Sequence, residues 1–149
     1  MPGRESLLKG QYYANPRNDF WRLVYGVFDE QLTPGISYSQ RIEFLMARRL
    51  AVWDVLQSCE RSGSGDESIT NPAVNDFESF LKANPGIRCV CFNGKKARAL
   101  FEEMVRPSLT RRMGLITLPS SSPAHAIAFG KKLERWSIIK AFLGPDPPL

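Results

Sequence analysis

The sequence predicts an α/β fold in which helices cover both faces of a short parallel sheet, giving a three-layer α/β/α sandwich. Short apolar runs alternate with segments whose apolar residues recur at helical spacing, the pattern of βαβ units. Hydrophobic residues make up 43% and charged residues 23% of the 149 residues, which excludes a wholly disordered chain. We expect one domain over residues 1–143 and a flexible tail over 144–149.

The chain divides into elements as follows. Gly, Pro and Asn interrupt every period in residues 1–18, so we expect a loop there. Apolar spacing predicts helices over residues 18–28 and 38–50, the first of them capped by Asn18 or Asp19. The later predicted elements are a buried strand at 51–56, a polar functional loop at 58–72, a helix at 75–84, a strand at 87–92, a helix after Asn93-Gly94, a strand at 114–118, a loop at 119–123 and a helix at 124–142.

Three loops are expected to leave the carboxyl edge of this parallel sheet. They follow Trp53-Asp54, Phe92-Asn93 and Leu118-Pro119. Ligands of open parallel sheets bind outside the carboxyl ends of the strands, so we expect the functional site at these loops.

The charge is distributed unevenly along the chain. Residues 1–84 hold 9 Lys/Arg and 11 Asp/Glu, a net −2, whereas residues 85–149 hold 11 Lys/Arg and 4 Asp/Glu, a net +7. A positive half favours an anionic partner, most commonly nucleic acid. The alternative is a basic surface that only keeps the protein soluble.

Several classes of protein and site are excluded or disfavoured. No apolar run approaches the ~18 residues of a membrane span, and no signal peptide is visible. Walker, G-x-G-x-x-G, H-E-x-x-H and zinc-type spacings are absent, and the single histidine, His125, supplies neither paired metal ligands nor a supported catalytic triad. We expect Cys59, Cys89 and Cys91 to be reduced structural thiols of a cytoplasmic protein rather than metal ligands or disulfides.

Two adjacent tyrosines, Tyr12 and Tyr13, lie in the predicted opening loop. Aromatic rings in such a loop can form a wall on which a nucleic-acid base stacks, and packing at the rim of the fold is the alternative. The opening residues read M-P-G-x-x-S-L-x-x-G-Q-Y-Y-A-x-P-R-N-x-F-W. They resemble the first motif of the hypoxanthine-DNA glycosylases, the deoxyinosine-removing branch of the uracil-DNA glycosylase superfamily.

The resemblance continues in order through three further segments. They are W-D-V-L with S-C-E-R and G-S at 53–64, F-N-G-K-K-A at 92–97, and L-P-S-S-S-P-A-H-A at 118–126. It implies a uracil-DNA glycosylase-like fold. It also implies base-excision repair of DNA that contains a deaminated base, by hydrolysis of the N-glycosidic bond after the nucleotide is flipped out. No cofactor or metal is implied, and we expect a monomer that does not bind membranes.

The resemblance also implies roles for individual residues. Asn18 is expected to position the attacking water, or else only to cap the helix. Asp54 is expected to contact the base or sugar during catalysis, or else to be a satisfied carboxylate. Base contacts are expected from Tyr13, Phe20 and Asn93. Contacts to the DNA backbone are expected from a set of loop residues: Gly3, Ser6, Gly94, Lys95, Ser120, Ser121, Ser122 and His125.

Two departures from the family pattern bear on this reading. Leu118 stands where many relatives have a histidine that stabilises departing uracil, which fits a preference for hypoxanthine. The family's apolar strand before Met-Pro-Gly has no counterpart here, so we expect a mis-assigned start or a truncated copy. We expect this form to be poorly soluble or nearly inactive, and an upstream extension to restore activity. The alternatives are a uracil or mismatch glycosylase and a non-catalytic, truncated DNA-binding paralogue.

Overall fold

The computed structural model describes residues 3–61 and 69–144. Its helices are α1 (Arg4–Lys9), α2 (Phe20–Val27), α3 (Tyr38–Ala47), α4 (Phe77–Ala83), α5 (Lys95–Met104) and α6 (Phe129–Trp136), with 3-10 turns η2 (Arg106–Ser108) and η3 (Ser137–Phe142). Its strands are β1 (Leu56–Arg61), β2 (Ile69–Val74), β3 (Cys89–Asn93) and β4 (Gly114–Leu118).

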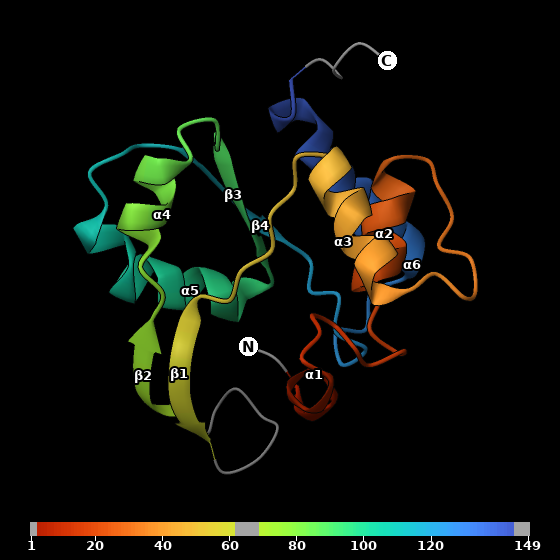
Figure 1. Ribbon diagram of the computed structural model, residues 1–149, viewed down its shortest axis with the longest axis horizontal. Helices are drawn as coiled ribbons and strands as arrows, with labels where there is room; N and C mark the ends of the chain where they lie inside the picture. Colours follow the sequence, from red (N-terminus) through yellow and green to blue (C-terminus); the bar gives the residue numbers. More distant parts are fainter. Residues whose placement is uncertain (1–2, 62–68, 145–149) are drawn as a thin grey trace.

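The centre of the fold is the parallel pair β3 and β4, aligned from Cys89 opposite Gly114 to Asn93 opposite Leu118. Successive side chains of a strand point to opposite faces. Phe92 packs with α4 and α5 in one apolar cluster, while Leu118 packs with α2 and α6 in another. Figure 1 shows α4 and α5 on one side of this sheet and α2, α3 and α6 on the other. The predicted three-layer α/β fold is confirmed.

Helix α2 supplies much of the core on the α6 side. Six of its eight residues are buried, and Leu23 has no exposed surface. Trp136 at the end of α6 is also buried, and its indole N–H donates to the Pro119 carbonyl oxygen at 2.9 Å. This bond attaches the loop after β4 to the helical layer.

The prediction of a buried strand at 51–56 is wrong in its bounds and its partner. Residues 51–55 have no assigned strand structure, and β1 begins only at Leu56. In the described part of the chain, β1 pairs with β2 in an antiparallel hairpin and neither strand joins the β3–β4 sheet. The apolar run identified a buried segment, but a strand also needs a hydrogen-bonding neighbour, which composition does not reveal.

The predicted polar loop at 58–72 is largely this hairpin. Residues 58–61 lie in β1 and 69–72 in β2, while 62–68 are outside the described residues. Glu60 is opposite Thr70, and the Asn71 side-chain amide donates to the Glu60 carboxylate at 3.2 Å. A two-stranded ribbon carries many polar side chains, so its composition is similar to that of a loop and led to the loop prediction.

Both ends of the chain differ from the prediction in detail. Helix α1 interrupts the expected opening loop, and Met1 and Pro2 lie outside the described residues. The last helix begins at Phe129 rather than Ala124, because a turn closed by the His125 N–H and the Ser122 carbonyl oxygen occupies the expected first turn. Of the expected tail, residues 145–149 are not described. Among the described helices, none is long and apolar enough to span a membrane.

Candidate active site

Two of the three predicted loops meet at the carboxyl edge of the sheet. Because Asn93 ends β3 opposite Leu118 at the end of β4, the loops that follow start side by side. The Gly94 N–H donates to the Leu118 carbonyl oxygen at 3.1 Å. Gly94 has φ 99°, and a Cβ there would lie 3.2 Å from the Ser120 Cβ. Only glycine fits this crossing without strain.

The Asn93 side chain joins three segments of the chain at this edge. Its amide nitrogen donates to the Tyr13 hydroxyl at 2.9 Å and to the Ser121 hydroxyl at 2.7 Å. Its amide oxygen accepts from the Ser121 N–H at 2.8 Å. Both amide protons are therefore in use, and a direct contact from this amide to a base requires one of the two bonds to open.

Tyr13 lies between the opening segment and the sheet edge. Its ring stacks on Phe20 with centroids 3.8 Å apart and planes 13° from parallel. Burial, and then the nearby Asp54 charge, raise the pKa of the Tyr13 hydroxyl to about 12, so the phenol is neutral at physiological pH. Its backbone φ of 51° is uncommon for a residue with a side chain and favours a functional or tightly constrained position.

Asn18 and Phe20 lie at the start of α2. The Asn18 amide oxygen accepts from the Phe20 N–H at 3.0 Å, so the capping role left open by the sequence is present. Phe20 is buried, with one face covered by Tyr13 and the Trp136 ring nearly perpendicular to it. Of the two stacked rings, Tyr13 is therefore the more exposed, and a base that stacks here would meet Tyr13 first.

Asp54 is partly buried on the segment before β1. Burial raises the pKa of its carboxyl above the ordinary value of 3.8. Its carbonyl oxygen accepts from the Asn75 side-chain amide at 2.8 Å, which fixes the backbone at this point. Burial, and then the charge of the nearby Asp54 carboxylate, raise the pKa of the Tyr12 hydroxyl.

A cavity of about 1020 Å³ lies between residues 50–56 and β3. Its lining includes Tyr13, Phe20, Asp54 and Asn93, four of the five residues predicted to act on the base or sugar. Asn18, the fifth, is not part of the lining and lies two residues before Phe20. The remaining lining is mainly apolar, as expected for a site that receives an aromatic ring.

The serine loop, residues 119–122, contains one buried and two partly exposed serines. Ser121 has no exposed surface, so the predicted contact of its hydroxyl with a phosphate is excluded in this conformation. The Ser120 hydroxyl accepts from the Ser122 N–H at 3.2 Å, and the Ser122 hydroxyl accepts from the Ala124 N–H at 3.3 Å. Residues 123–128 separate this loop from Phe129, the first residue of α6.

The remaining predicted DNA contacts are dispersed. Gly3 is exposed at the start of α1, and Lys95 is exposed at the start of α5. His125 is exposed in the turn after the serine loop rather than in the helix. Ser6 is buried, and its hydroxyl accepts from the Ala14 N–H at 3.1 Å, so it connects α1 to the opening segment instead of lying on an exposed surface as a DNA contact would.

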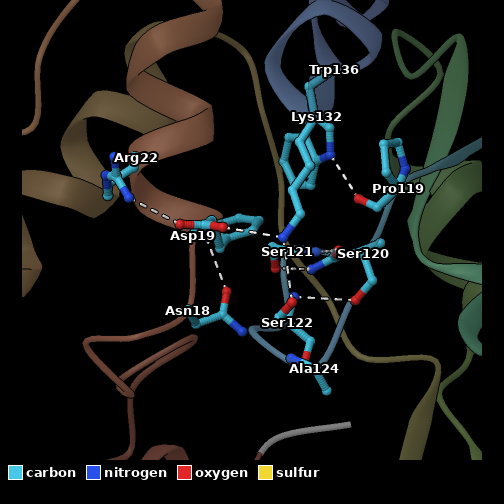
Figure 2. Close-up of polar contacts among 12 residues, drawn as sticks. Asn18, Asp19, Arg22, Pro119, Ser120, Ser121, Ser122, Ala124, Lys132 and Trp136 are labelled. Atoms are coloured by element: carbon cyan, nitrogen blue, oxygen red, sulfur yellow. Dashed lines mark hydrogen bonds and ion pairs between the residues drawn. The ribbon is translucent and has the colours of Figure 1, made fainter. Parts of the chain in front are cut away.

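The sequence reading missed a buried lysine behind the serine loop. Lys132 is 1% exposed, and its ammonium contacts the Asp19 carboxylate at 3.1 Å and the Ser122 carbonyl oxygen at 3.4 Å (Figure 2). A signal was available, because Lys132 follows Phe129 by three residues and precedes Trp136 by four. It therefore shares the apolar face of α6.

No group of three or more His, Cys, Asp or Glu residues within 3–61 and 69–144 is placed to hold a metal ion. The arrangement instead offers an aromatic platform, a partly buried carboxylate and oriented amides around an apolar cavity. Such a site can receive a planar base and position polar groups around it.

A family model described as the uracil DNA glycosylase superfamily matches residues 1–143. The chain belongs to this superfamily. A protein of Methanosarcina acetivorans named hypoxanthine DNA glycosylase is 37% identical over 141 residues, covering 93% of this chain and 85% of that protein. A protein of the same name from Methanosarcina barkeri is 34% identical over 139 residues, covering 92% and 84%.

Among solved structures, a glycosylase-like neighbour matches nearly the whole fold. It is a solution NMR structure of a Methanosarcina acetivorans protein whose name assigns it to the uracil DNA glycosylases. The TM-score is 0.79 at 35% identity, over 97% of this chain and 86% of that one. Membership of the superfamily thus rests on both sequence and fold.

Proposed function

We propose that this protein is a DNA glycosylase that hydrolyses the N-glycosidic bond of a deaminated base, hypoxanthine in deoxyinosine. The observation that carries the proposal is the joining of distant motifs at one sheet edge. Tyr13 from the opening motif, Asn93 from the third and Ser121 from the last are linked by hydrogen bonds of 2.7 to 2.9 Å. The two named relatives support hypoxanthine as the base.

Deamination gives the base a chemical feature that a donor can read. Adenine carries an amino group at C6, and hypoxanthine carries a carbonyl oxygen there, so a hydrogen-bond donor on the base becomes an acceptor. Asn93 lines the cavity, and its amide nitrogen is a hydrogen-bond donor. We propose that it passes one of its bonds to the flipped base, which stacks on the ring of Tyr13.

Hydrolysis requires a water at the anomeric carbon of the sugar. The water oxygen bonds to that carbon, the C–N bond breaks with its electron pair moving to the purine, and one water proton ends on the departing base. Positive charge develops on the sugar meanwhile. We propose that Asn18, next to the base cavity but outside its lining, orients this water through its side-chain amide. Asp54 would face the positive sugar.

The proposal extends to the DNA backbone and is tested with duplex substrates. Lys95 and the hydroxyls of Ser120 and Ser122 are the expected contacts at this edge, whereas Gly94, also predicted from the sequence, is buried and its N–H donates to the Leu118 carbonyl oxygen. The test measures base release from matched duplexes that contain deoxyinosine, deoxyuridine or only normal bases. We expect release of hypoxanthine at a rate at least tenfold above that of uracil. Preferential uracil release would favour the alternative glycosylase, and binding without release would favour a non-catalytic module.

A second candidate, a uracil glycosylase on the same scaffold, is supported by the name of the structural neighbour. Uracil also presents a carbonyl oxygen where its parent base has an amino group. The same donor would therefore read both bases. The cavity of about 1020 Å³ has room for either base, so the names of the two curated relatives, rather than the volume, favour hypoxanthine.

A further inference from the structure

Lys132 is a buried cation with two defined partners. Its side chain is 2% exposed, and its ammonium lies 3.1 Å from the Asp19 Oδ2 and 3.4 Å from the Ser122 carbonyl oxygen. Figure 2 shows the side chain extending from α6 between the start of α2 and the serine loop. The start of α2, the serine loop and α6 therefore meet at one nitrogen atom.

Asp19 holds the same loop through its backbone. Its N–H donates to the Ser121 carbonyl oxygen at 3.0 Å. Lys132 donates to the carbonyl oxygen of the next residue, Ser122. Two successive carbonyl groups of the serine loop are thus held against α2 and α6, and Ser121 presents its N–H and hydroxyl to Asn93 on the other side.

The ion pair also decides which side chain caps α2. An aspartate at a helix start ordinarily accepts from backbone N–H groups of the first turn. Here the Asp19 carboxylate makes no such bond, and it instead contacts Lys132 and, through its other oxygen, Arg22 at 3.1 Å. The Phe20 N–H is satisfied by Asn18, whose amide is held in one orientation as a result.

Stability alone does not account for a lysine at this position. Burying an ammonium has a desolvation penalty, and replacing a buried ion pair by apolar side chains of similar size is often neutral or stabilising. The lysine is on the apolar face of α6, where methionine has similar length and no charge. What methionine lacks is the pair of directed bonds to Asp19 and Ser122.

We propose that Lys132 is a positioning residue for base release: it fixes the start of α2 against the serine loop and thereby sets Asn18 relative to Tyr13, Asn93 and Ser121. This proposal rests on the proposed glycosylase activity. Lys132 is not proposed to contact DNA, because its ammonium is enclosed by protein groups.

The test compares Lys132→Met with Lys131→Met, the same substitution at the exposed neighbouring residue of the same helix. Single-turnover release from a deoxyinosine duplex should fall ~10- to 100-fold in Lys132→Met, because small misplacements of reacting groups are costly. The dissociation constant for the duplex should stay within threefold. Lys131→Met should keep the single-turnover rate within twofold of wild type. Equal losses in both variants, or weaker binding with an unchanged rate, would overturn the proposal.

A double variant separates positioning from general loosening of the fold. In an Asn18→Ala background, Lys132→Met should lower the rate by less than threefold, because the group that it positions is already missing. The full loss repeated in that background would show that Lys132 acts independently of Asn18. If Lys132→Met alone does not fold, Asp19→Asn combined with Lys132→Met removes both charges, and the same rate and binding measurements apply.

Hydrogen exchange tests, without relying on activity, whether Lys132 holds the start of α2 against the serine loop. The Asp19 amide, which donates to Ser121, should exchange at least tenfold faster in Lys132→Met and at the wild-type rate in Lys131→Met. Unchanged protection of the Asp19 amide in Lys132→Met would overturn the proposal that Lys132 holds these two segments together. If wild type releases no base from any duplex but Lys132→Met still shows faster exchange at the Asp19 amide, the proposed function is overturned. The role of Lys132 in holding α2 against the serine loop then stands.

Discussion

Asn93 illustrates how a polar residue at a strand end can organise a site. Its amide makes three hydrogen bonds, to Tyr13 and twice to Ser121, and so fixes an aromatic ring and a loop at once. A network of this kind is rigid when every member is paired. Sequence reasoning located Asn93 at the sheet edge and expected it to meet a base. It could not foresee the buried partner Ser121, because three consecutive serines look alike until a fold buries one of them.

The partly buried carboxyl of Asp54 gives a prediction at the residue scale. Its pKa is raised by burial, so the folded protein binds this proton more tightly than the unfolded chain. The stability linked to the proton is present below the ordinary pKa of 3.8 and is lost as pH rises through the raised value. Asp54→Asn should therefore match wild type near pH 3 and melt a few degrees higher at pH 7, with release from deoxyinosine duplexes reduced more than binding.

Thermal melts at several pH values check this expectation. Asp76→Asn is the matched control, because the hydrogen bonds from Ser79 lower the pKa of that exposed carboxyl. Asp76→Asn should therefore be less stable than wild type at pH 7, the opposite sign to Asp54→Asn, and the difference should vanish as pH falls below the ordinary value of 3.8 and through the lowered pKa. An Asp54→Asn variant that is more stable and fully active would identify Asp54 as a carboxylate without a catalytic role.

At the scale of elements, the site depends on how two parallel strands end. The sequence placed loops after both strands at one edge, and the register of β3 with β4 confirms that they meet. The alternation of strands with helices was enough for this, because two strands joined through a helix run parallel and therefore end at the same edge of the sheet. The segment 51–55 could not be predicted in the same way. Its apolar run is consistent with a strand, and only the tertiary fold shows that, in the described chain, no strand pairs with it.

Gly94 gives a prediction at the element scale. It combines φ 99° with a Ser120 Cβ only 3.2 Å from where its own Cβ would lie. Gly94→Ala should destabilise the fold by ~1–3 kcal/mol and displace the serine loop, so that base release falls by at least tenfold. Gly130→Ala is the control, since nothing lies within 4 Å of that added Cβ and α6 should gain helix propensity. Chemical denaturation and single-turnover rates measure both effects, and an unaffected Gly94→Ala would mean that the loop crossing is not constrained.

At the scale of the whole molecule, three layers hold segments from both ends of the chain against one sheet edge. The opening motif reaches the edge through Tyr13 and α2, and the last motif reaches it through the serine loop and α6. The four motifs occur in the sequence in the same order as in the family that they resemble, and this resemblance predicted that they meet at one site. The buried Lys132, which links the start of α2 to the serine loop, was not predicted. A lysine among apolar residues is usually interpreted as a solvent-exposed position.

The charge distribution predicts how binding depends on salt. Residues 85–149 carry the net +7 and include α5, β4, the serine loop and α6. Each phosphate contact to duplex DNA should contribute roughly −0.9 to the slope of log affinity against log salt. For three to five contacts we expect a slope of about −3 to −4.5 by fluorescence anisotropy. Lys95→Gln should make the slope less steep by about one contact, and a slope near zero would argue against a nucleic-acid partner.

The most direct test of the central claim, that this site hydrolyses the bond to a deaminated base, is single-turnover release of hypoxanthine by wild type, Asn18→Ala and Asn18→Ser. Serine caps a helix about as well as asparagine but lacks the side-chain amide. The sequence alone led us to expect a poorly soluble or nearly inactive form, but the hydrogen bonds that join Tyr13, Asn93 and Ser121 lead us to predict release by wild type. We also predict a loss of ~100-fold or more in both variants, duplex binding within threefold, and a melting temperature preserved in Asn18→Ser. Full activity in both variants, or a wild type that releases no base, would contradict the account.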